Sequence, residues 1–172
     1  MKIWLSVFVL FLSILPHQGQ AAENEMPAVH VEEKAIEEVL NAFHEAAAKA
    51  NLEAYFSHFA PDGVFIGTDA DERWSVPAFK AYVAPHFAKG KGWTYKARER
   101  HISFHAGKGA VFAWFDELLD SASYGTARGS GVLLKVGKDW KIAQYNLSFP
   151  IPNDLAKGMT ETIKAFEAKT AK

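Results

Sequence analysis

The sharpest group of side chains that could do chemistry is the run Trp114-Phe115-Asp116-Glu117. Neighbouring residues on a strand face opposite ways, so at most one of Asp116 and Glu117 can enter a pocket. Burial beside aromatic rings would raise the pKa of that carboxyl group, which could then act as a general acid or base. The alternative is a structural carboxylate paired with Arg98 or Arg128 across a sheet, because ion pairs also perturb carboxyl groups.

A polar row on the expected last strand, which begins at Trp140, is the second candidate. Alternation places one set of side chains on one face, Ile142, Gln144, Asn146 and Ser148, and the other set opposite, Ala143, Tyr145, Leu147 and Phe149. Gln144 and Asn146 both donate and accept hydrogen bonds, so they could orient a carbonyl or a carboxylate. Such a row either lines a pocket or belongs to an internal network or a wet sheet face.

Three further kinds of side chain could bind a ligand. The guanidinium of Arg128 could hold an anion through two hydrogen bonds, or pair with one of the two carboxylates instead. His58 could act as a base, although a lone histidine is more often a packed or surface residue. Trp74 and Trp93 could wall a cavity, although large aromatic side chains are more often part of a core.

The sequence offers no motif for a metal or a cofactor. It has seven histidines, none at a zinc-site spacing, and no cysteine. The run Asp69-Ala70-Asp71-Glu72 lacks the rest of a calcium loop. There is no phosphate-binding loop, dinucleotide fingerprint or nucleophile elbow. We therefore expect a protein with no cofactor, no metal site and no disulfide.

Composition and the N-terminus bound the class of protein. The chain has 172 residues, which fits one domain, and its formal net charge of -1 does not suggest a nucleic-acid partner. Lys2, the apolar stretch 3–15 and the small residues at 19 and 21 predict a signal peptide over 1–21, cleaved after Ala21. An uncleaved anchor is the alternative, but the stretch is short for a membrane span. We expect a periplasmic or secreted protein that leaves the membrane after cleavage.

The elements that must position these residues form a helical half and a sheet half. After a flexible lead over 22–30, apolar residues recur at three- and four-residue steps from Val31, as in an amphipathic helix. Helices are then expected over 52–59 and 75–89, and strands over 64–66, 93–105, 110–119, 128–136 and from 140. Gly129 and Gly131 fit a bend in a strand. This order predicts an α+β fold, with helices in the concave face of a curved sheet.

Several segments carry a resemblance to a known family. They are the first helix, Asn51 to Ile66, the helix from Ser75 to Phe87, the strand after Gly109, and the ending Gly137 to Ser148. In these the chain resembles the nuclear transport factor 2-like superfamily, in its SnoaL-like branch. The resemblance covers 31–152, and the last helix, 153–172, looks like an addition.

The resemblance implies a cone-shaped, curved antiparallel sheet wrapped around the N-terminal helices, enclosing a pocket. It also implies a homodimer built by contact between sheets. On this geometry Gln144 and Asn146 point into the cone, and Tyr55 and His58 lie near its mouth. Members of the family include isomerases, dehydratases, polyketide cyclases and epoxide hydrolases, and also inactive assembly modules, so the fold does not choose the function.

We therefore predict an exported homodimer that binds a small, largely apolar molecule bearing a carbonyl or a carboxylate. The predicted ligand-binding residues are Tyr55, His58, Trp74, Trp114, Arg128, Gln144 and Asn146. The enzyme alternative is isomerisation, dehydration or hydrolysis without a cofactor, with Asp116 or Glu117 as the catalytic carboxylate. A third interpretation is an assembly module without chemistry.

Overall fold

The computed structural model describes residues 20–107 and 110–170. By its internal contacts the chain divides into two units, 1–32 and 33–172. The second unit contains the sheet and the helices that pack on it. The signal peptide predicted over 1–21 lies almost wholly outside the described residues.

Helix α1 spans Gln20–Ala48 and so includes residues 22–30, for which the sequence predicts a flexible lead. Alanine, glutamate, glutamine and methionine make up most of 20–28, and these residues have high helix propensities. Further along α1 the predicted apolar periodicity is confirmed, because the residues at those steps are buried: Ile36, Leu40, Phe43, Ala46 and Ala47.

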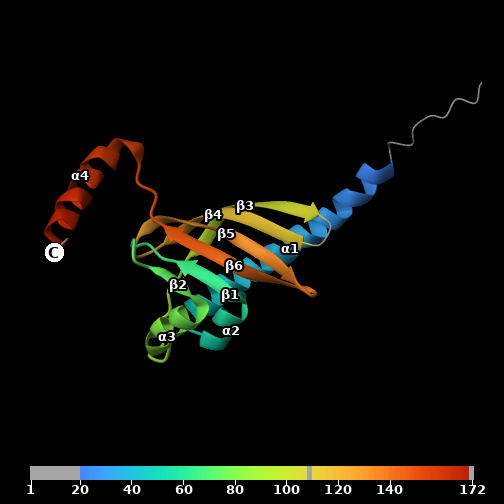
Figure 1. Cartoon of the computed structure of the whole chain (residues 1–172), viewed down its shortest axis with the longest axis horizontal. Coiled ribbons are helices and arrows are strands. Elements are labelled where there is room, and N and C mark those ends of the chain that lie inside the picture. Colours follow the sequence, from blue (N-terminus) through green and yellow to red (C-terminus); the bar gives the residue numbers. More distant parts are fainter. Residues whose placement is uncertain (1–19, 108–109, 171–172) are drawn as a thin grey trace, which may run out of the picture. The chain divides into compact units, whose positions relative to one another are not determined.

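Two shorter helices follow, each with a polar cap. Helix α2 (Leu52–Ser57) begins after Asn51, whose side chain caps it. Helix α3 (Val76–Phe87) begins after Ser75, the predicted N-cap, whose hydroxyl lies 3.5 Å from the backbone nitrogen of Ala78. Helix α3 contacts α2 and the first two strands, so both helices lie beside that edge of the sheet (Figure 1).

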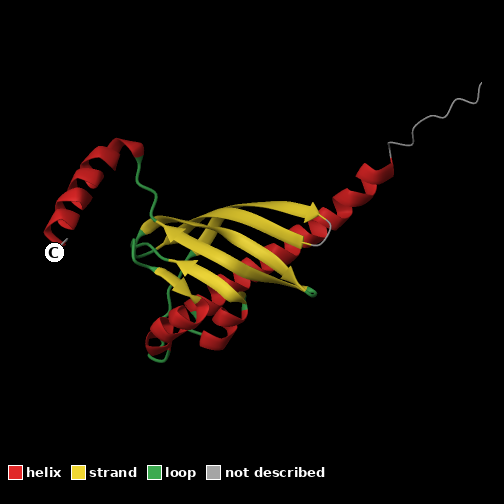
Figure 2. Ribbon diagram, in the orientation of Figure 1, coloured by secondary structure: helices red, strands yellow, loops and turns green. Residues whose placement is uncertain are grey.

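Six strands form one curved sheet, in the order β2-β1-β6-β5-β4-β3 (Figure 2). The strands are β1 (Phe59–Ile66), β2 (Arg73–Ser75), β3 (Lys96–Gly107), β4 (Ala110–Ser121), β5 (Gly125–Val136) and β6 (Asp139–Ser148). All neighbours are antiparallel except β1 and β6, which run parallel. The predicted α+β fold with a curved sheet is confirmed, and this parallel pair is an addition to it.

Two register shifts change which side chains face inward. One lies between Ala97 and Glu99 on β3, and the other falls at Ala143 on β6. Each shift inserts one residue into a strand, and one extra residue moves every later side chain to the other face. Gly129 and Gly131, predicted to mark a bend, lie on the strand opposite the second shift.

The inner face of the sheet and the helices share one apolar core. Its sheet residues include Phe115, Leu133, Ile142 and Tyr145, all buried against α1, α2 and α3. Phe43 of α1 stands among their rings, with its centroid 5.0 Å from that of Tyr145. The aromatic side chains therefore hold the helices to the sheet.

Helix α4 (Asn153–Thr170) follows the sheet and buries none of its residues. The thin apolar stripe predicted on it is present and exposed, and consists of Leu155, Met159, Ile163 and Phe166. In the described part of the chain, no helix is both long and apolar enough to cross a membrane.

Candidate functional site

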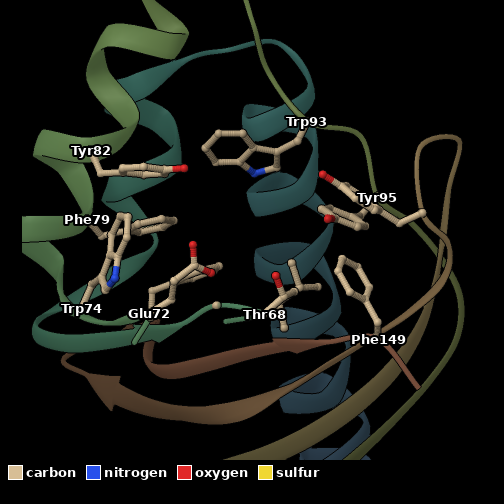
Figure 3. A pocket seen from close by; sticks show the side chains of 12 residues that line it. Thr68, Glu72, Trp74, Phe79, Tyr82, Trp93, Tyr95 and Phe149 are labelled. Atoms are coloured by element: carbon tan, nitrogen blue, oxygen red, sulfur yellow. The ribbon is translucent and has the colours of Figure 1, made fainter. Parts of the chain in front are cut away.

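An aromatic pocket of about 230 Å³ lies where the ends of β1 and β6 meet β2 and α3 (Figure 3). Twelve residues line it: Phe65, Gly67, Thr68, Glu72, Trp74, Phe79, Tyr82, Trp93, Tyr95, Tyr124, Leu147 and Phe149. Eight of the twelve are aromatic, which is the apolar surface that small-molecule sites use. We call it the aromatic pocket.

The walls of the aromatic pocket brace one another. The ring of Trp74 meets the ring of Tyr82 edge-on, with centroids 4.2 Å apart. The rings of Phe65 and Phe79 stack at 4.0 Å behind them. Edge-on and stacked pairs of this kind add to the stabilisation from burial alone. The walls are therefore largely preformed.

The polar groups of the pocket come from the loop between β1 and β2. The carboxylate of Glu72 points into the pocket, with the Thr68 side chain beside it (Figure 3). The backbone fixes this loop, because the Gly67 amide donates to the Glu72 carbonyl at 2.8 Å. The Asp69 amide donates to the Glu72 carboxylate at 3.3 Å.

A narrow void of about 10 Å³ continues inward from the aromatic pocket. It shares Phe65, Trp93, Tyr95 and Leu147 with the pocket and adds Phe43, His44, Ala47, Tyr55 and Tyr145. A single water needs roughly 10–15 Å³ of such space. The void therefore admits one water at most.

A buried carboxylate network lies behind that void and centres on Glu117, which is 1% exposed. The Tyr145 hydroxyl donates to Glu117 Oε1 at 2.8 Å, and His44 Nε2 lies 2.8 Å from the same oxygen. Arg100 donates from Nε to Oε2 at 2.8 Å, and its Nη2 lies 2.7 Å from Glu117. An ionised carboxylate only accepts, so His44 Nε2 carries the proton in this pair.

The charge of Glu117 is stabilised by its neighbours. Burial by itself raises the pKa of Glu117, but the hydrogen bond and charge of His44, the charge of Arg100 and the Tyr145 hydroxyl outweigh it. The pKa of Glu117 is therefore lowered. Burial and the Glu117 charge together raise the pKa of Tyr145 well above its ordinary value, so its phenol stays protonated.

The two register shifts build this network. Simple alternation from the exposed Lys96 would turn Arg100 outward. The shift on β3 adds one residue before Arg100, so its side chain faces inward instead. The shift at Ala143 puts Tyr145 on the same inner face as Ile142. Gly129 lies on the strand between Glu117 and Tyr145. A Cβ at this position would clash with the Tyr145 hydroxyl and the Glu117 carboxylate. A side chain at Gly129 would therefore push the pair apart.

Of the two predicted catalytic carboxylates, one faces inward and one outward. Glu117 is buried, while Asp116 is exposed on the outer face of β4, opposite Ser130. The predicted rise in the pKa of the inward carboxyl group is wrong, because cationic partners outweigh burial. Its partner is Arg100, and neither of the arginines proposed from the sequence, Arg98 and Arg128, bonds to it.

The predicted polar row also faces the wrong way. Gln144 is exposed and pairs across the sheet with Val132, on the outer face that carries Trp114. Asn146 is half-buried on that same face, and Arg128 is exposed. The insertion at Ala143 is the cause for Gln144 and Asn146, since it moves them off the face of the inward-facing Ile142. None of these four predicted ligand-binding residues lines the aromatic pocket.

The remaining predicted residues divide between core, groove and pocket. Tyr55 is 1% exposed and lines the inner void, where burial raises its pKa. His58 lines a separate, open groove of about 320 Å³, where burial and Lys141 lower its pKa. Trp74 lines the aromatic pocket, as does Trp93.

Sequence reasoning missed Glu72, His44, Arg100 and Tyr145. His44 has a signal, because it sits four residues after Leu40 on the buried stripe of α1, where a polar side chain needs a partner. The others have none, since Glu72 lies in a loop and the register shifts hide Arg100 and Tyr145. Among the described residues, no group of three or more histidines and carboxylates is placed so that it could hold a metal ion.

These features define a class of protein: helices packed in a curved sheet with a preformed pocket at one end. The chain belongs to the SnoaL-like domain family, whose model matches residues 36–152, within the nuclear transport factor 2-like superfamily. A search of curated protein sequences found no match.

Solved structures show the same fold at low identity. A domain of unknown function from Nostoc punctiforme has a TM-score of 0.60 at 13% identity, covering 82% of this chain and 93% of that one. An NTF2-like protein of unknown function from Pseudomonas putida has a TM-score of 0.57 at 13% identity, covering 72% and 90%. A candidate dehydratase from Streptomyces avermitilis has a TM-score of 0.55 at 15% identity, covering 73% and 99%.

Proposed function

We propose that this chain is an exported protein that binds a small, largely apolar molecule in the aromatic pocket. The observation that carries this proposal is the set of eight aromatic residues around one preformed hollow. Binding sites combine such walls with a few convergent polar groups, which Glu72 and Thr68 supply here. The groove at His58 is the weaker candidate, because charged side chains form much of its lining.

The aromatic pocket does not contain the polar side chains that the sequence predicts would bind a carbonyl or a carboxylate. The residues expected to contact a carbonyl or a carboxylate, Arg128, Gln144 and Asn146, lie on the outer face of the sheet. We propose instead that specificity comes from the loop between β1 and β2. Export rests on the predicted signal peptide alone, and N-terminal sequencing of the secreted chain tests cleavage after Ala21.

The second candidate function is acid–base catalysis by His44. The ring is oriented by Glu117 at 2.8 Å, as in enzymes where a carboxylate positions a histidine base. Solved structures with the same fold include candidate dehydratases. A substrate in the aromatic pocket is separated from His44 by the narrow void, so proton transfer would pass through one water. Ligand binding without chemistry is therefore the first candidate function, and catalysis by His44 is the second.

We also propose a homodimer that uses the outer face of the sheet. Apolar side chains are exposed there, with Trp114 46%, Leu134 36% and Val136 51% accessible. Exposed apolar patches on a soluble protein commonly mark an interface. Sedimentation of the wild type and of a Trp114→Lys variant tests this, and we expect the variant to shift toward monomer.

The central experiment is native mass spectrometry of the purified mature protein, followed by tryptophan fluorescence during ligand titration. We expect bound organic mass, and a fluorescence change that is reduced in Trp74→Phe, lost in the double variant Trp74→Phe/Trp93→Phe, and kept in Trp114→Phe. The single variants each remove one tryptophan, from the pocket or from the outer face, and the double variant removes both tryptophans of the pocket. A ligand-free oligomer that no small molecule stabilises against heat would reject binding and favour an assembly module. Turnover lost in His44→Gln, with affinity unchanged, would favour catalysis.

A further inference from the structure

Glu72 is a carboxylate without a cation. Among the described residues that line the aromatic pocket it carries the only charge. No lysine, arginine or histidine in the described part of the chain forms an ion pair with it, and its carboxylate accepts one backbone hydrogen bond. Gly67 leaves room for this group, because a Cβ at Gly67 would occupy the space of the Glu72 carboxylate. The loop therefore accommodates the carboxylate at the pocket, and the Asp69 amide orients it.

The nearest arginine in the sequence does not neutralise Glu72 from within the pocket. Trp74 lines the pocket and pairs with Phe65 across β1 and β2. Arg73 is the next residue on the same strand, so its exposed side chain points to the opposite face. The pocket therefore presents a negative group that no cationic side chain of residues 20–107 or 110–170 balances.

The walls around this charge suit a cation as well. Trp74, Trp93, Tyr82 and Tyr95 surround the space into which Glu72 points (Figure 3). The faces of tryptophan and tyrosine rings attract cations, most strongly when the cation is partly desolvated. An anionic ligand would meet repulsion from Glu72 and from the ring faces, whereas a cation would be attracted by both.

We propose that the aromatic pocket binds a compact organic ammonium ion. The alkyl groups of the ligand pack on the aromatic walls while its positive charge lies beside the carboxylate of Glu72. The volume of about 230 Å³ favours a small ligand, since pockets for drug-sized molecules span roughly 300–1,000 Å³. This inference rests on the proposed function, and it names the chemical class of ligand that the same pocket takes.

The test compares cations with uncharged molecules of the same shape. Titration calorimetry of the mature protein uses choline against 3,3-dimethylbutan-1-ol, and benzylamine against benzyl alcohol. We expect at least one cation to bind about tenfold or more tightly than its neutral counterpart, because both the carboxylate and the rings favour positive charge. Raising the salt concentration should narrow this difference, because the pocket is partly open to solvent.

A pair of loop variants locates the effect. Glu72→Gln removes the charge and keeps an acceptor for the Asp69 amide, so we expect the preference for the cation to fall by about tenfold while neutral binding is unchanged. Asp71→Asn is the matched control, because it removes one charge from the same loop at an exposed residue that does not line the pocket. Thermal unfolding confirms that both variants are folded.

The outcomes separate this inference from the proposed function. If neutral and charged members of each pair bind equally, the ammonium inference is wrong and the small-molecule proposal stands. The ammonium inference is equally wrong if Glu72→Gln and Asp71→Asn change the binding of the cation by the same amount. If none of the four probes binds, and no other small molecule stabilises the protein against heat, both proposals fail.

Discussion

Glu117 and Glu72 are two inward-facing carboxylates with opposite surroundings. Glu117 is enclosed and accepts from His44, Arg100 and Tyr145. Glu72 faces an open aromatic hollow and accepts one backbone hydrogen bond. A carboxylate whose charge and hydrogen bonds are satisfied by the protein is costly to unpair, and one left without a cation is available to a ligand. The contrast shows that burial alone does not mark a functional acid.

The largest effect should follow from Glu117→Gln. The substitution leaves Arg100 buried without its counter-ion, and breaking a buried ion pair in this way typically costs about 3–5 kcal/mol of stability. Urea unfolding at neutral pH measures the loss. The control is Asp120→Asn, which breaks the exposed pair with Arg98 and should cost about 0–1 kcal/mol. Equal losses would mean that the Glu117 network is not a special source of stability.

The difference in unfolding free energy between the wild type and Glu117→Gln should depend on pH. The folded-state pKa of Glu117 is lowered from its ordinary value of 4.5, so its contribution to stability is present above about pH 4.5 and is lost as the pH falls through the folded pKa. We expect the gap in unfolding free energy between the wild type and Glu117→Gln to be constant above that pH and to shrink below it. A gap that grows on acidification would contradict this sign.

A smaller effect is expected from Tyr145→Phe. The change removes the hydroxyl that donates to Glu117 and keeps the ring that packs on Phe43. Hydrogen bonds to charged groups are worth about 1.5–3 kcal/mol, and we expect a loss of that size in thermal or urea unfolding. Tyr124→Phe is the matched control, because Tyr124 is 63% exposed. If Tyr145→Phe loses no more unfolding free energy than the control, the hydrogen bond from Tyr145 to Glu117 does not contribute to stability.

The smallest effect on stability should come from Glu72→Gln. The carboxylate has no cationic partner among the described residues, so its neutralisation should change the free energy of unfolding by about 0.5 kcal/mol or less. The measurement is urea unfolding of the variant without ligand. A loss comparable to that of Glu117→Gln would abolish the distinction between the two carboxylates.

Much of the fold can be predicted because its signals are local. The buried stripe of α1 follows from apolar residues at helical steps, and the start of α3 follows from Ser75 as a cap. Within the site, the sequence predicts Trp74 as a wall, and the pair at 116 and 117 predicts one inward carboxylate. These features depend only on neighbouring residues.

The network around Glu117 depends on two inserted residues that leave no local trace. Alternation counted along β6 puts Gln144 beside Ile142, whereas the shift at Ala143 places Gln144 outside and Tyr145 inside. On β3 a similar shift turns Arg100 inward. A register shift is set by pairing with distant strands, so the face of a side chain beyond it cannot be read from the strand itself.

The parallel pairing of β1 with β6 has a consequence for how the chain folds. Phe65 pairs with Tyr145, 80 positions later, so this contact closes a long loop and belongs among the slow steps of folding. Because Phe65 and Leu147 both line the aromatic pocket, the pocket can assemble only after the last strand has arrived. A chain that emerges N-terminus first therefore completes the aromatic pocket near the end of folding.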